Sequence, residues 1–372
     1  MQNDVISYFL SLVAIDSESR DERRMIDTLK ADLEALDCTV EEDDCHHKTG
    51  GNAGNLHAIF PGSIQKPPIL FCSHVDTVTP GKGIKAQIVG DKIVSDGTTV
   101  LGSDDKSGIA EIMVALHRVK QSGKAHAPVE ILFTISEEIG LLGAKGFDKS
   151  KLKSALGYAL DTHRVGELVL GAPSQNSFKA TFHGKEAHAG VEPEKGLNAI
   201  RIASEAIAAM PLGRIDFETT CNVGIIQGGE ATNIVPNKVT IKGEARSHNP
   251  QKLERICNDI RTAIQSTVAR YEAQGARVDF NCVQEYKSFS VAEDAPVVQL
   301  AVAALRKLDI PFTTGKGGGG SDANILTANG IPIIITGTGM DKVHTVNECI
   351  ELDQLRLGTD FVEELIYGYS EL

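Results

Sequence analysis

The chain has 372 residues, of which 41% are hydrophobic and 23% are charged, and its formal net charge is −13 at pH 7. These proportions are ordinary for a globular protein, and the length suits two domains or one large domain with an insertion. The acidic balance argues against a nucleic-acid-binding protein, which needs a basic surface.

The seven cysteines stand singly, and no Cys-x-x-Cys pair occurs. This usage indicates neither a disulfide framework nor a zinc ribbon, and it predicts a cytoplasmic protein. The first twenty residues are partly apolar, but they carry Asp4 and Asp16 and have no basic start. We therefore expect an amphipathic helix there, not a signal peptide. No apolar run reaches membrane-spanning length, so we expect no membrane association.

The first part of the chain and its last eighty residues alternate helices with continuous apolar strands. Apolar residues at helical spacing predict helices over 4–15, 21–36, 104–119, 295–308 and 352–372. Apolar runs without alternation predict buried strands near 69–72, 129–136, 156–160 and 331–336, and a hairpin is expected over 81–94. This alternation predicts an α/β fold, a mostly parallel sheet with helices on both faces.

The pattern changes between residues 175 and 286. Half-exposed strands and two helices follow one another in the order β-α-β-β-α-β of the split ferredoxin-like motif. The expected ranges are 177–183, 197–210, 219–227, 235–246, 249–274 with Asn249 as the cap, and 276–283. We therefore predict a discontinuous main domain, residues 1–174 and 287–372, and a separate inserted α+β domain, residues 175–286.

Acidic or histidine side chains follow the buried strands of the main domain. His74 and Asp76 come after the first of these strands, and their spacing of two points both to one side. Glu137 and Glu138 follow the next strand, and Asp161 ends the third. Because ligands bind at the carboxyl ends of the strands in open α/β sheets, we expect these side chains to lie together.

Two further polar points belong to the same edge. Asp104 and Asp105 open a predicted helix, and His344 follows the strand at 331–336. Taken singly, each group has an ordinary explanation as a core histidine, a helix N-cap or a solvated helix start. Their recurrence from strand to strand favours a metal site. Histidines and carboxylates without cysteine suit zinc, cobalt or manganese.

A carboxylate that bridges two ions would make a site able to lower the pKa of a bound water. Another carboxylate must then stay free of metal to take the proton of that water. Glu137, directly beside Glu138, is the natural candidate for this general base. Asp76 suits an acid that orients His74 from behind.

The motifs taken together resemble one family. The chain contains, in order, FCSHVDTV, LGSDDKSG, ISEEIG, ALDT, GKEAHAG, ATNIVPNKV, GGGGSDAN and HTVNECI. This set is similar to the M20 family of dinuclear zinc exopeptidases, and within it to the peptidase T-like (tripeptide aminopeptidase) branch. The resemblance covers nearly the whole chain. It implies a zinc exopeptidase-like catalytic domain and an inserted lid that also forms a homodimer.

The resemblance further implies two Zn²⁺ per chain, with Co²⁺ or Mn²⁺ as substitutes, and Asp104 as the shared ligand. The implied ligands are His74, Asp104 and Asp161 for one ion, and Asp104, Glu138 and His344 for the other. Asp76 would orient His74, and Glu137 would act as general base and then as acid. A cis peptide bond would follow Asp104.

Five residues of the insertion and the loop after it would contact the substrate by the same resemblance. His188 would stabilise the oxyanion of the tetrahedral intermediate, often across a dimer, and Asn233 would lie nearby. Arg246 would bind the terminal carboxylate of the substrate. The glycine run that contains Gly319 and ends at Ser321 would offer backbone N–H groups to a carboxylate. From the residues alone, a strand-end histidine, a turn asparagine, a surface arginine and a flexible glycine loop explain the same positions.

The predicted function is metal-dependent hydrolysis of short peptides by an aminopeptidase or tripeptidase. Asp161 favours a substrate with a free N-terminus, because many amino-acylases and carboxypeptidases of the family have Glu at this position. An alternative within the family is an amidohydrolase that deacylates N-acyl amino acids, or a dipeptidase or carboxypeptidase. A metal-free binding protein on the same scaffold is a further alternative, but it predicts lost ligands, and every ligand position is present here.

Overall fold

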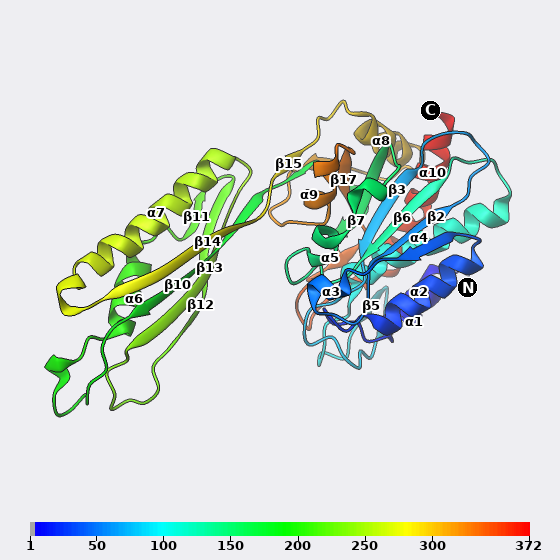
Figure 1. Cartoon of the computed structure of the whole chain (residues 1–372). Coiled ribbons are helices and arrows are strands. Elements are labelled where there is room, and N and C mark those ends of the chain that lie inside the picture. Colours follow the sequence, from blue (N-terminus) through cyan, green and yellow to red (C-terminus); the bar gives the residue numbers. More distant parts are fainter. Residues whose placement is uncertain (1–3) are drawn as a thin grey trace. The chain divides into compact units, whose positions relative to one another are not determined.

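The computed structural model describes residues 4–372, so the first three residues of the predicted main domain lie outside it. The chain forms two compact units, each with its own hydrophobic cluster (Figure 1). The large unit contains the chain up to Gly171, Ser290–Gly317 and Ser321–Leu372. The inserted unit contains Ala172–Phe289 and Gly318–Gly320. Short strands β9 (Gly171–Ala172) and β15 (Phe289–Ser290) pair where the chain passes between the units.

An eight-stranded sheet of order β1-β2-β6-β3-β7-β17-β8-β16 forms the centre of the large unit. Its strands are β1 (Thr39–Glu42), β2 (Leu56–Phe60), β3 (Ile69–His74), β6 (Val129–Thr134), β7 (Leu156–Thr162), β8 (Glu167–Val169), β16 (Thr313–Gly315) and β17 (Ile333–Gly337). The four central strands β6, β3, β7 and β17 are parallel, whereas β1, β2 and the β17–β8 pair are antiparallel. The mostly parallel α/β sheet is therefore confirmed.

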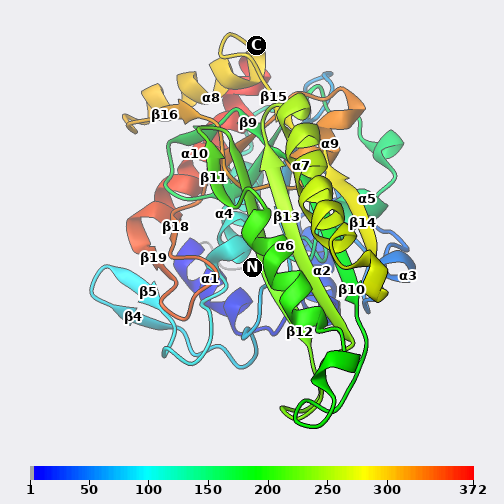
Figure 2. The same ribbon diagram turned by 90° about the vertical axis from the view of Figure 1, so that its left-hand side faces the viewer.

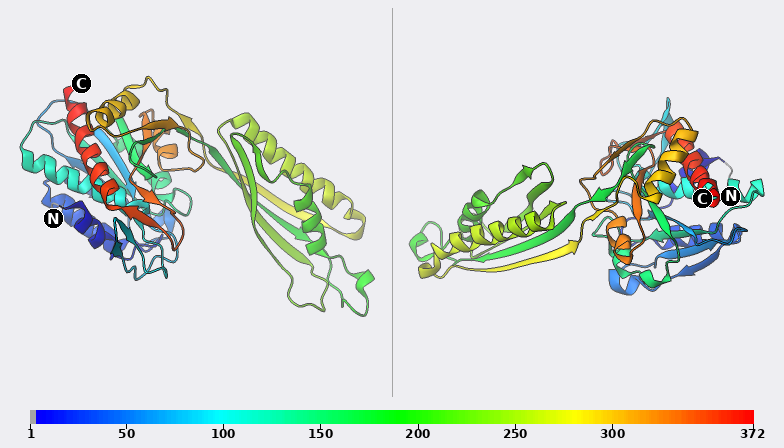
Figure 3. Two further views of the ribbon diagram at one scale, coloured as in Figure 1. Left: turned by 180° about the vertical axis from the view of Figure 1, so that it is seen from behind. Right: turned by 90° about the horizontal axis from the view of Figure 1, so that it is seen from above.

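Both faces of this sheet are covered. Every residue of β3 and β6 is buried, as their continuous apolar sequences require. The longer helices are α1 (Val5–Val13), α2 (Arg23–Ala35), α4 (Ser103–Ser122), α8 (Pro296–Lys307) and α10 (Leu352–Glu371). Helix α4 packs on β3 and β7, and α10, the red helix in Figure 3, lies beside α4. The shorter helices are α3 (His46–Thr49), α5 (Leu142–Gly146) and α9 (Ala323–Leu326).

Helix α4 has an irregular start that matters for the site. Its first turn contains Asp104 and Asp105, whose backbone angles are not helical, and the peptide bond between them is cis. The cis peptide implied by the family resemblance is therefore confirmed. Helical geometry continues to Ser122 and ends at Gly123, whose φ of 64° is the left-handed conformation usual after a helix.

A second, four-stranded antiparallel sheet of order β18-β19-β5-β4 also belongs to the large unit. It contains β4 (Gln87–Val89), β5 (Lys92–Val94), β18 (Met340–Asp341) and β19 (Cys349–Glu351). The hairpin predicted over 81–94 is confirmed as β4 and β5. Because β18 and β19 pair with each other, the segment 342–348 between them forms a closed loop.

The inserted unit is a five-stranded antiparallel sheet of order β11-β12-β13-β10-β14. Its elements are β10 (Ser174–His183), α6 (Ala199–Ala209), β11 (Gly213–Asp216), β12 (Thr219–Gly228), β13 (Lys238–Ser247), α7 (Pro250–Ala269) and β14 (Arg277–Tyr286). Apart from the short β11, which the sequence did not indicate, the ferredoxin-like order is confirmed. Both helices lie on the same face of the sheet (Figure 2). The predicted cap is confirmed, since the Asn249 side chain accepts hydrogen bonds from Gln251 and Lys252.

Among the described residues, no helix is both long enough and apolar enough to span a bilayer.

Candidate metal centre

Three neighbouring parallel strands deliver polar groups to one edge of the large sheet. β3 ends at His74, β6 leads directly into Glu137 and Glu138, and Asp161 lies near the end of β7. The ligand atoms of His74, Asp104 and Glu138 all lie within 4.8 Å of one another. The strand ends that the sequence marked therefore come together in space.

Asp104 lies between the two histidines. Its Oδ1 is 3.0 Å from Nε2 of His74, and its Oδ2 is 3.2 Å from Nε2 of His344. The same nitrogen of His344 is 2.9 Å from Oε1 of Glu138. Burial alone would raise the pKa of Asp104, but the hydrogen bonds with the two imidazoles hold it below its ordinary value. Each carboxylate oxygen thus faces a different imidazole, as expected of a carboxylate that bridges two ions.

A second group of donors shares His74. One ligand atom each from His74, Asp105 and Asp161 also lies within 4.8 Å of the others. Asp105 Oδ2 accepts a 2.5 Å hydrogen bond from the Ser73 hydroxyl, whereas its Oδ1 has no hydrogen-bond partner among the described residues. Asp105 was not among the ligands that the family resemblance implied, which included only its neighbour Asp104.

The electrostatics of these groups fit bound cations. Burial, with neighbouring acids, raises the pKa of Asp161 to about 8, and burial also raises the pKa of Glu137 well above its ordinary value. So many buried carboxylates oppose one another's ionisation unless positive charge compensates them. Imidazole nitrogens and carboxylate oxygens are ligands that zinc, cobalt and manganese accept. The residues present therefore fit a metal centre.

The Asp76 carboxylate, predicted only to orient His74, also binds the backbone of the turn that follows β6. It accepts hydrogen bonds from the backbone N–H of Glu137 at 2.9 Å, the N–H of Glu138 at 3.2 Å and the Ser19 hydroxyl at 2.6 Å. Nδ1 of His74 is 3.0 Å from the main-chain carbonyl of Asp76 and 3.4 Å from its carboxylate. The carbonyl is thus the nearer partner of His74, while the carboxylate chiefly holds the Glu137–Glu138 turn.

Glu22 holds the same turn from the other side. One of its oxygens accepts hydrogen bonds from the Ser136 N–H at 3.1 Å and from the Ser136 hydroxyl at 2.9 Å. Burial raises the pKa of Glu22 to about 7. Ser136 has a φ of 53°, a conformation that a non-glycine residue keeps only where its surroundings impose it. Glu22 precedes an ordinary amphipathic helix, so no local sequence signal indicates this contact.

In the inserted unit, two of the three predicted substrate contacts are neighbours. His188 and Asn233 are both exposed, and Ala189 donates its N–H to the carbonyl of Asn233 at 2.9 Å. Arg246 lies elsewhere on this unit. Its guanidinium makes two hydrogen bonds with Glu244, at 2.8 and 3.1 Å. The grip on a substrate carboxylate predicted for Arg246 must therefore compete with an internal carboxylate.

Strand β13 separates Arg246 from His188. Its first residue, Lys238, pairs with His183, after which the chain enters the loop that carries His188. Arg246 is eight residues further along β13. At roughly 3.3 Å per residue, that is about 26 Å from the end of the strand nearest His188. The structure does not bring these two side chains together within one chain.

The glycine run divides between the units. Gly318–Gly320 belongs to the inserted unit, where Gly320 packs so closely on the Tyr286 ring that a Cβ there would lie 2.2 Å from the phenolic oxygen. Ser321 belongs to the large unit. Its backbone N–H donates to the Asn324 side chain at 3.0 Å, so this N–H already has a partner. The N–H of Gly317 also has a partner, the Gly171 carbonyl at 2.9 Å, so Gly318, Gly319 and Gly320 are the donors to test.

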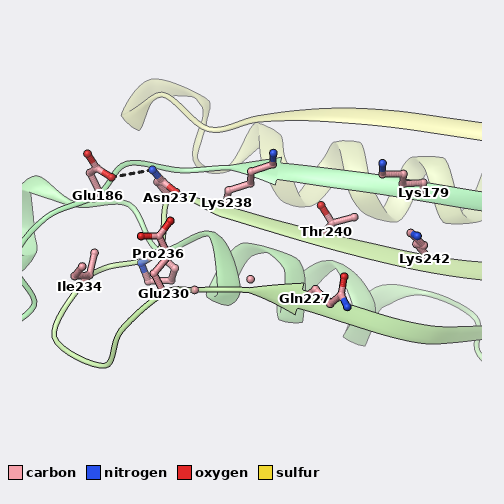
Figure 4. A pocket seen from close by; sticks show the side chains of 12 residues that line it. Lys179, Glu186, Gln227, Glu230, Ile234, Pro236, Asn237, Lys238, Thr240 and Lys242 are labelled. Carbon is pink, nitrogen blue, oxygen red and sulfur yellow. Dashed lines mark hydrogen bonds between the residues drawn. The ribbon is translucent and has the colours of Figure 1, made fainter.

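A hollow of about 470 Å³ lies on the inserted unit, over the sheet face opposite α6 and α7 (Figure 4). Lys179, Thr240 and Lys242 line it, together with the turn at Gly228–Gly229. None of the predicted site residues lines it, and the clustered candidate metal ligands lie in the large unit.

Comparison with known proteins identifies two family models in the chain. The peptidase dimerisation domain matches residues 171–272, which belong almost entirely to the inserted unit. Peptidase family M28 matches residues 55–176, which contain β3, β6, β7 and the whole of α4.

Several proteins resemble the chain over its whole length. The Bacillus subtilis (strain 168) protein YqjE is 40% identical over 97% of both chains. The crystal structure of aminopeptidase PepT from Bacillus cereus is 40% identical, has a TM-score of 0.87, and is matched over 99% of this chain and 98% of its own. The crystal structure of a tripeptidase from Staphylococcus aureus is 35% identical, has a TM-score of 0.93, and is matched over the full length of both chains.

Proposed function

The chain belongs to the M20 family of metallopeptidases, in its peptidase T-like branch, and from this premise we propose that it is an aminopeptidase that removes the N-terminal residue of tripeptides and similarly short peptides. The observation that carries the proposal is the position of Asp104 between the imidazoles of His74 and His344, beside Glu138, with Asp161 grouped about the same His74. The names of the two solved relatives, an aminopeptidase and a tripeptidase, favour this substrate class.

We assign two metal ions to this centre, with zinc as the first choice and cobalt or manganese as substitutes. His74, Asp104 and Asp161 would hold one, and Asp104, Glu138 and His344 the other. When bound, such ions acidify a water and polarise the scissile carbonyl. Asp105, which groups with His74 and Asp161, would support the first ion from the side of Ser73.

Glu137 is the proposed general base. It is buried and makes no ion pair with either histidine in the structure, unlike Glu138. Asp76 fixes its backbone N–H, so its carboxylate can remain near the cluster without joining it. Glu137 would accept a proton from the attacking water and pass it to the leaving amine, a double use that is economical because both transfers occur at one carbonyl.

The proposed roles of His188 and Arg246 require two chains. A tripeptide spans at most about 11 Å when extended. Arg246 lies about 26 Å along β13 from the end nearest His188, and both belong to one compact unit, so no movement of that unit brings them to the same tripeptide. If both contact one substrate, His188 of one chain must serve the site of another. This supports a homodimer formed through the dimerisation domain.

We also propose that the protein works in the cytoplasm. All seven cysteines are free thiols in the structure, and six of them are buried. A set of unpaired thiols is typical of a reducing compartment.

A substrate panel on zinc-loaded protein tests the function. Tripeptides with a free amine are compared with their N-acetyl derivatives, with dipeptides and with N-acetyl amino acids, and the released residue is identified by mass spectrometry. Glu137→Gln protein, purified and zinc-loaded in the same way, serves as the control for contaminating peptidases. We expect release of the N-terminal residue from peptides with a free amine, fastest from tripeptides, and no cleavage of the N-acetyl compounds. Preferred cleavage of N-acetyl amino acids, or release of C-terminal residues, would replace the proposal with an amidohydrolase or a carboxypeptidase.

A further inference from the structure

Glu348 is a buried carboxylate that has no role in the proposed reaction. Its side chain is 1% exposed, and both of its oxygens are fully used as acceptors. One oxygen accepts from the backbone N–H of Leu101 at 2.8 Å and of Gly102 at 2.9 Å. The other accepts from the Ser103 hydroxyl at 2.6 Å and from the Asp104 N–H at 3.0 Å.

These four donors come from four consecutive residues that end at Asp104. The segment cannot be held by helical hydrogen bonds, because Gly102 has a φ of 73° and Asp104 and Asp105 depart from helical geometry. Its backbone N–H groups are the unsatisfied ones at the start of a helix, which need an acceptor from elsewhere. Glu348 supplies that acceptor. The position of the Asp104 carboxylate therefore depends on Glu348.

Glu348 also ends the loop that carries His344. That loop is strained, since Lys342 and His344 have φ values of 54° and 62°. It is closed by hydrogen bonds from the Thr345 hydroxyl to the Lys342 carbonyl at 2.7 Å and from the Glu348 N–H to the Thr345 carbonyl at 3.1 Å. A non-glycine residue keeps such a conformation only where the surrounding structure determines it. The buried Glu348 side chain is the anchor that ties this loop to the Asp104 segment.

We propose that Glu348 is a positioning residue that couples the two loops and so sets Asp104 and His344 at the separation one metal ion requires. The inference rests on the ligands assigned under the proposed function. Of the two assigned ions, one takes both Asp104 and His344, whereas the other takes only Asp104 from these loops. Loss of the Glu348 carboxylate should therefore weaken the ion at Asp104, Glu138 and His344 more than its neighbour.

The chemistry requires a carboxylate and not merely a side chain of this size. A glutamine has nearly the same shape, but its amide nitrogen would point hydrogens at two donors in place of an acceptor. In either orientation of the amide at least one buried backbone N–H loses its acceptor, which is costly, so the segment must shift. Glu348→Gln thus changes the hydrogen bonding with the smallest change in packing.

The test is metal binding, measured by titration against a chromophoric chelator and by metal analysis after equilibrium dialysis with Zn²⁺. Wild-type protein is compared with Glu348→Gln and with Glu351→Gln. Glu351 is a matched control three residues further on, where it pairs with Lys92 at the surface. We expect two ions in the wild type and in Glu351→Gln. In Glu348→Gln we expect one site weakened by about 10–100-fold, as is usual when a group that orients ligands is lost. Activity should return as zinc is raised, because Glu348 does not touch the substrate.

A milder variant covers the case in which Glu348→Gln does not fold. Ser103→Ala removes only the hydroxyl donor and should weaken the same site by a few-fold. Two sites of unchanged affinity in Glu348→Gln, or equal weakening of both sites in the folded variants, would overturn the inference. A wild-type protein that binds no metal, or that keeps both ions in His344→Ala, would instead overturn the proposed function.

Discussion

The large unit buries nine carboxyl side chains, whereas the buried polar side chains that the structure describes in the inserted unit all carry hydroxyl groups. The nine are Glu22, Asp76, Asp104, Asp105, Glu111, Glu130, Glu137, Asp322 and Glu348. Those of the inserted unit are Ser174, Thr181, Thr219, Ser247 and Thr267. The rest of its core is apolar, with Phe182, Val239 and Ile241 at its centre.

The two units therefore present their candidate functional residues differently, mostly buried in the large unit and mostly exposed in the inserted unit. Burying a carboxylate costs free energy unless hydrogen bonds or cations compensate it, so the large unit gives up stability to hold its site in place. The inserted unit has an ordinary core, and its candidate residues His188 and Asn233 lie exposed on loops. We therefore expect changes at the buried acids of the large unit to affect chemistry, metal binding and stability, and changes at the exposed candidate residues of the inserted unit to affect kinetics alone.

The largest effect should follow from Glu137→Gln. Because this substitution removes the proposed base but no proposed ligand, kcat should fall by about 10²–10⁴-fold or more, while both metal ions stay bound. Single-turnover kinetics and metal analysis on one preparation measure both properties. Glu138→Gln is the matched variant, and it should lose metal. Loss of metal in Glu137→Gln in step with its activity would make Glu137 a ligand instead.

His188→Ala should have the next largest effect, and it tests the inserted unit. A lost oxyanion donor lowers kcat by roughly 10²–10³-fold, with metal content and unfolding unchanged. Mixing Glu137→Gln with His188→Ala protein, under conditions where subunits exchange, should restore activity, because mixed dimers would contain one intact site. If exchange is demonstrated and no activity returns, His188 does not act across the dimer.

Arg246→Ala should act mainly on KM. A charge-assisted bidentate contact is worth more than a neutral hydrogen bond, but Glu244 already occupies the guanidinium. We therefore expect an increase in KM for tripeptides of about tenfold with little change in kcat, as for binding felt equally in ground and transition states. Tripeptide amides, which lack the terminal carboxylate, are the control and should be affected less. An equal effect on acid and amide would remove Arg246 from carboxylate binding.

The smallest effect concerns the stability of the large unit. Glu111 lies on α4 against Gly358, and neither of its oxygens has a hydrogen-bond partner among the described residues. Burial raises its pKa well above the ordinary value of 4.5. The folded protein therefore keeps the Glu111 proton at pH values where the unfolded chain has lost it. The free energy of unfolding is highest below pH 4.5 with respect to this group, and it falls as the pH rises towards the pKa of the folded state.

Glu111→Met removes that dependence and fills the same space with an apolar side chain. Metal-free variant and wild type are compared by urea unfolding at pH 5 and pH 8. The gain in stability should be larger at pH 8, on the order of 1–3 kcal/mol, the usual cost of a buried polar group without a partner. A variant that is less stable than wild type at both pH values would show that Glu111 is compensated in the fold.

Strand ends could be predicted because their signal is local. The buried strands are apolar without interruption, and the acids after them mark one edge, so the structure brings His74, Asp104, Glu138 and His344 together as expected. That metal ions bind there remains a prediction. Residues such as Glu22 and Glu348 could not be found this way, because their hydrogen bonds join segments more than one hundred residues apart. The strand β11 was missed for a different reason, because its four residues are too few to show a periodic pattern.

Each unit has its own hydrophobic cluster, and this bears on how the molecule unfolds. Two clusters without shared members give no reason for a single all-or-none transition. Calorimetry should then resolve two heat-absorption peaks, and one melting temperature would not describe the protein. A cation that binds only the folded large unit stabilises that unit by mass action and leaves the other unit unaffected. Adding zinc should move one peak to higher temperature and leave the second where it was, so a melting curve alone would show that a single unit holds the metal.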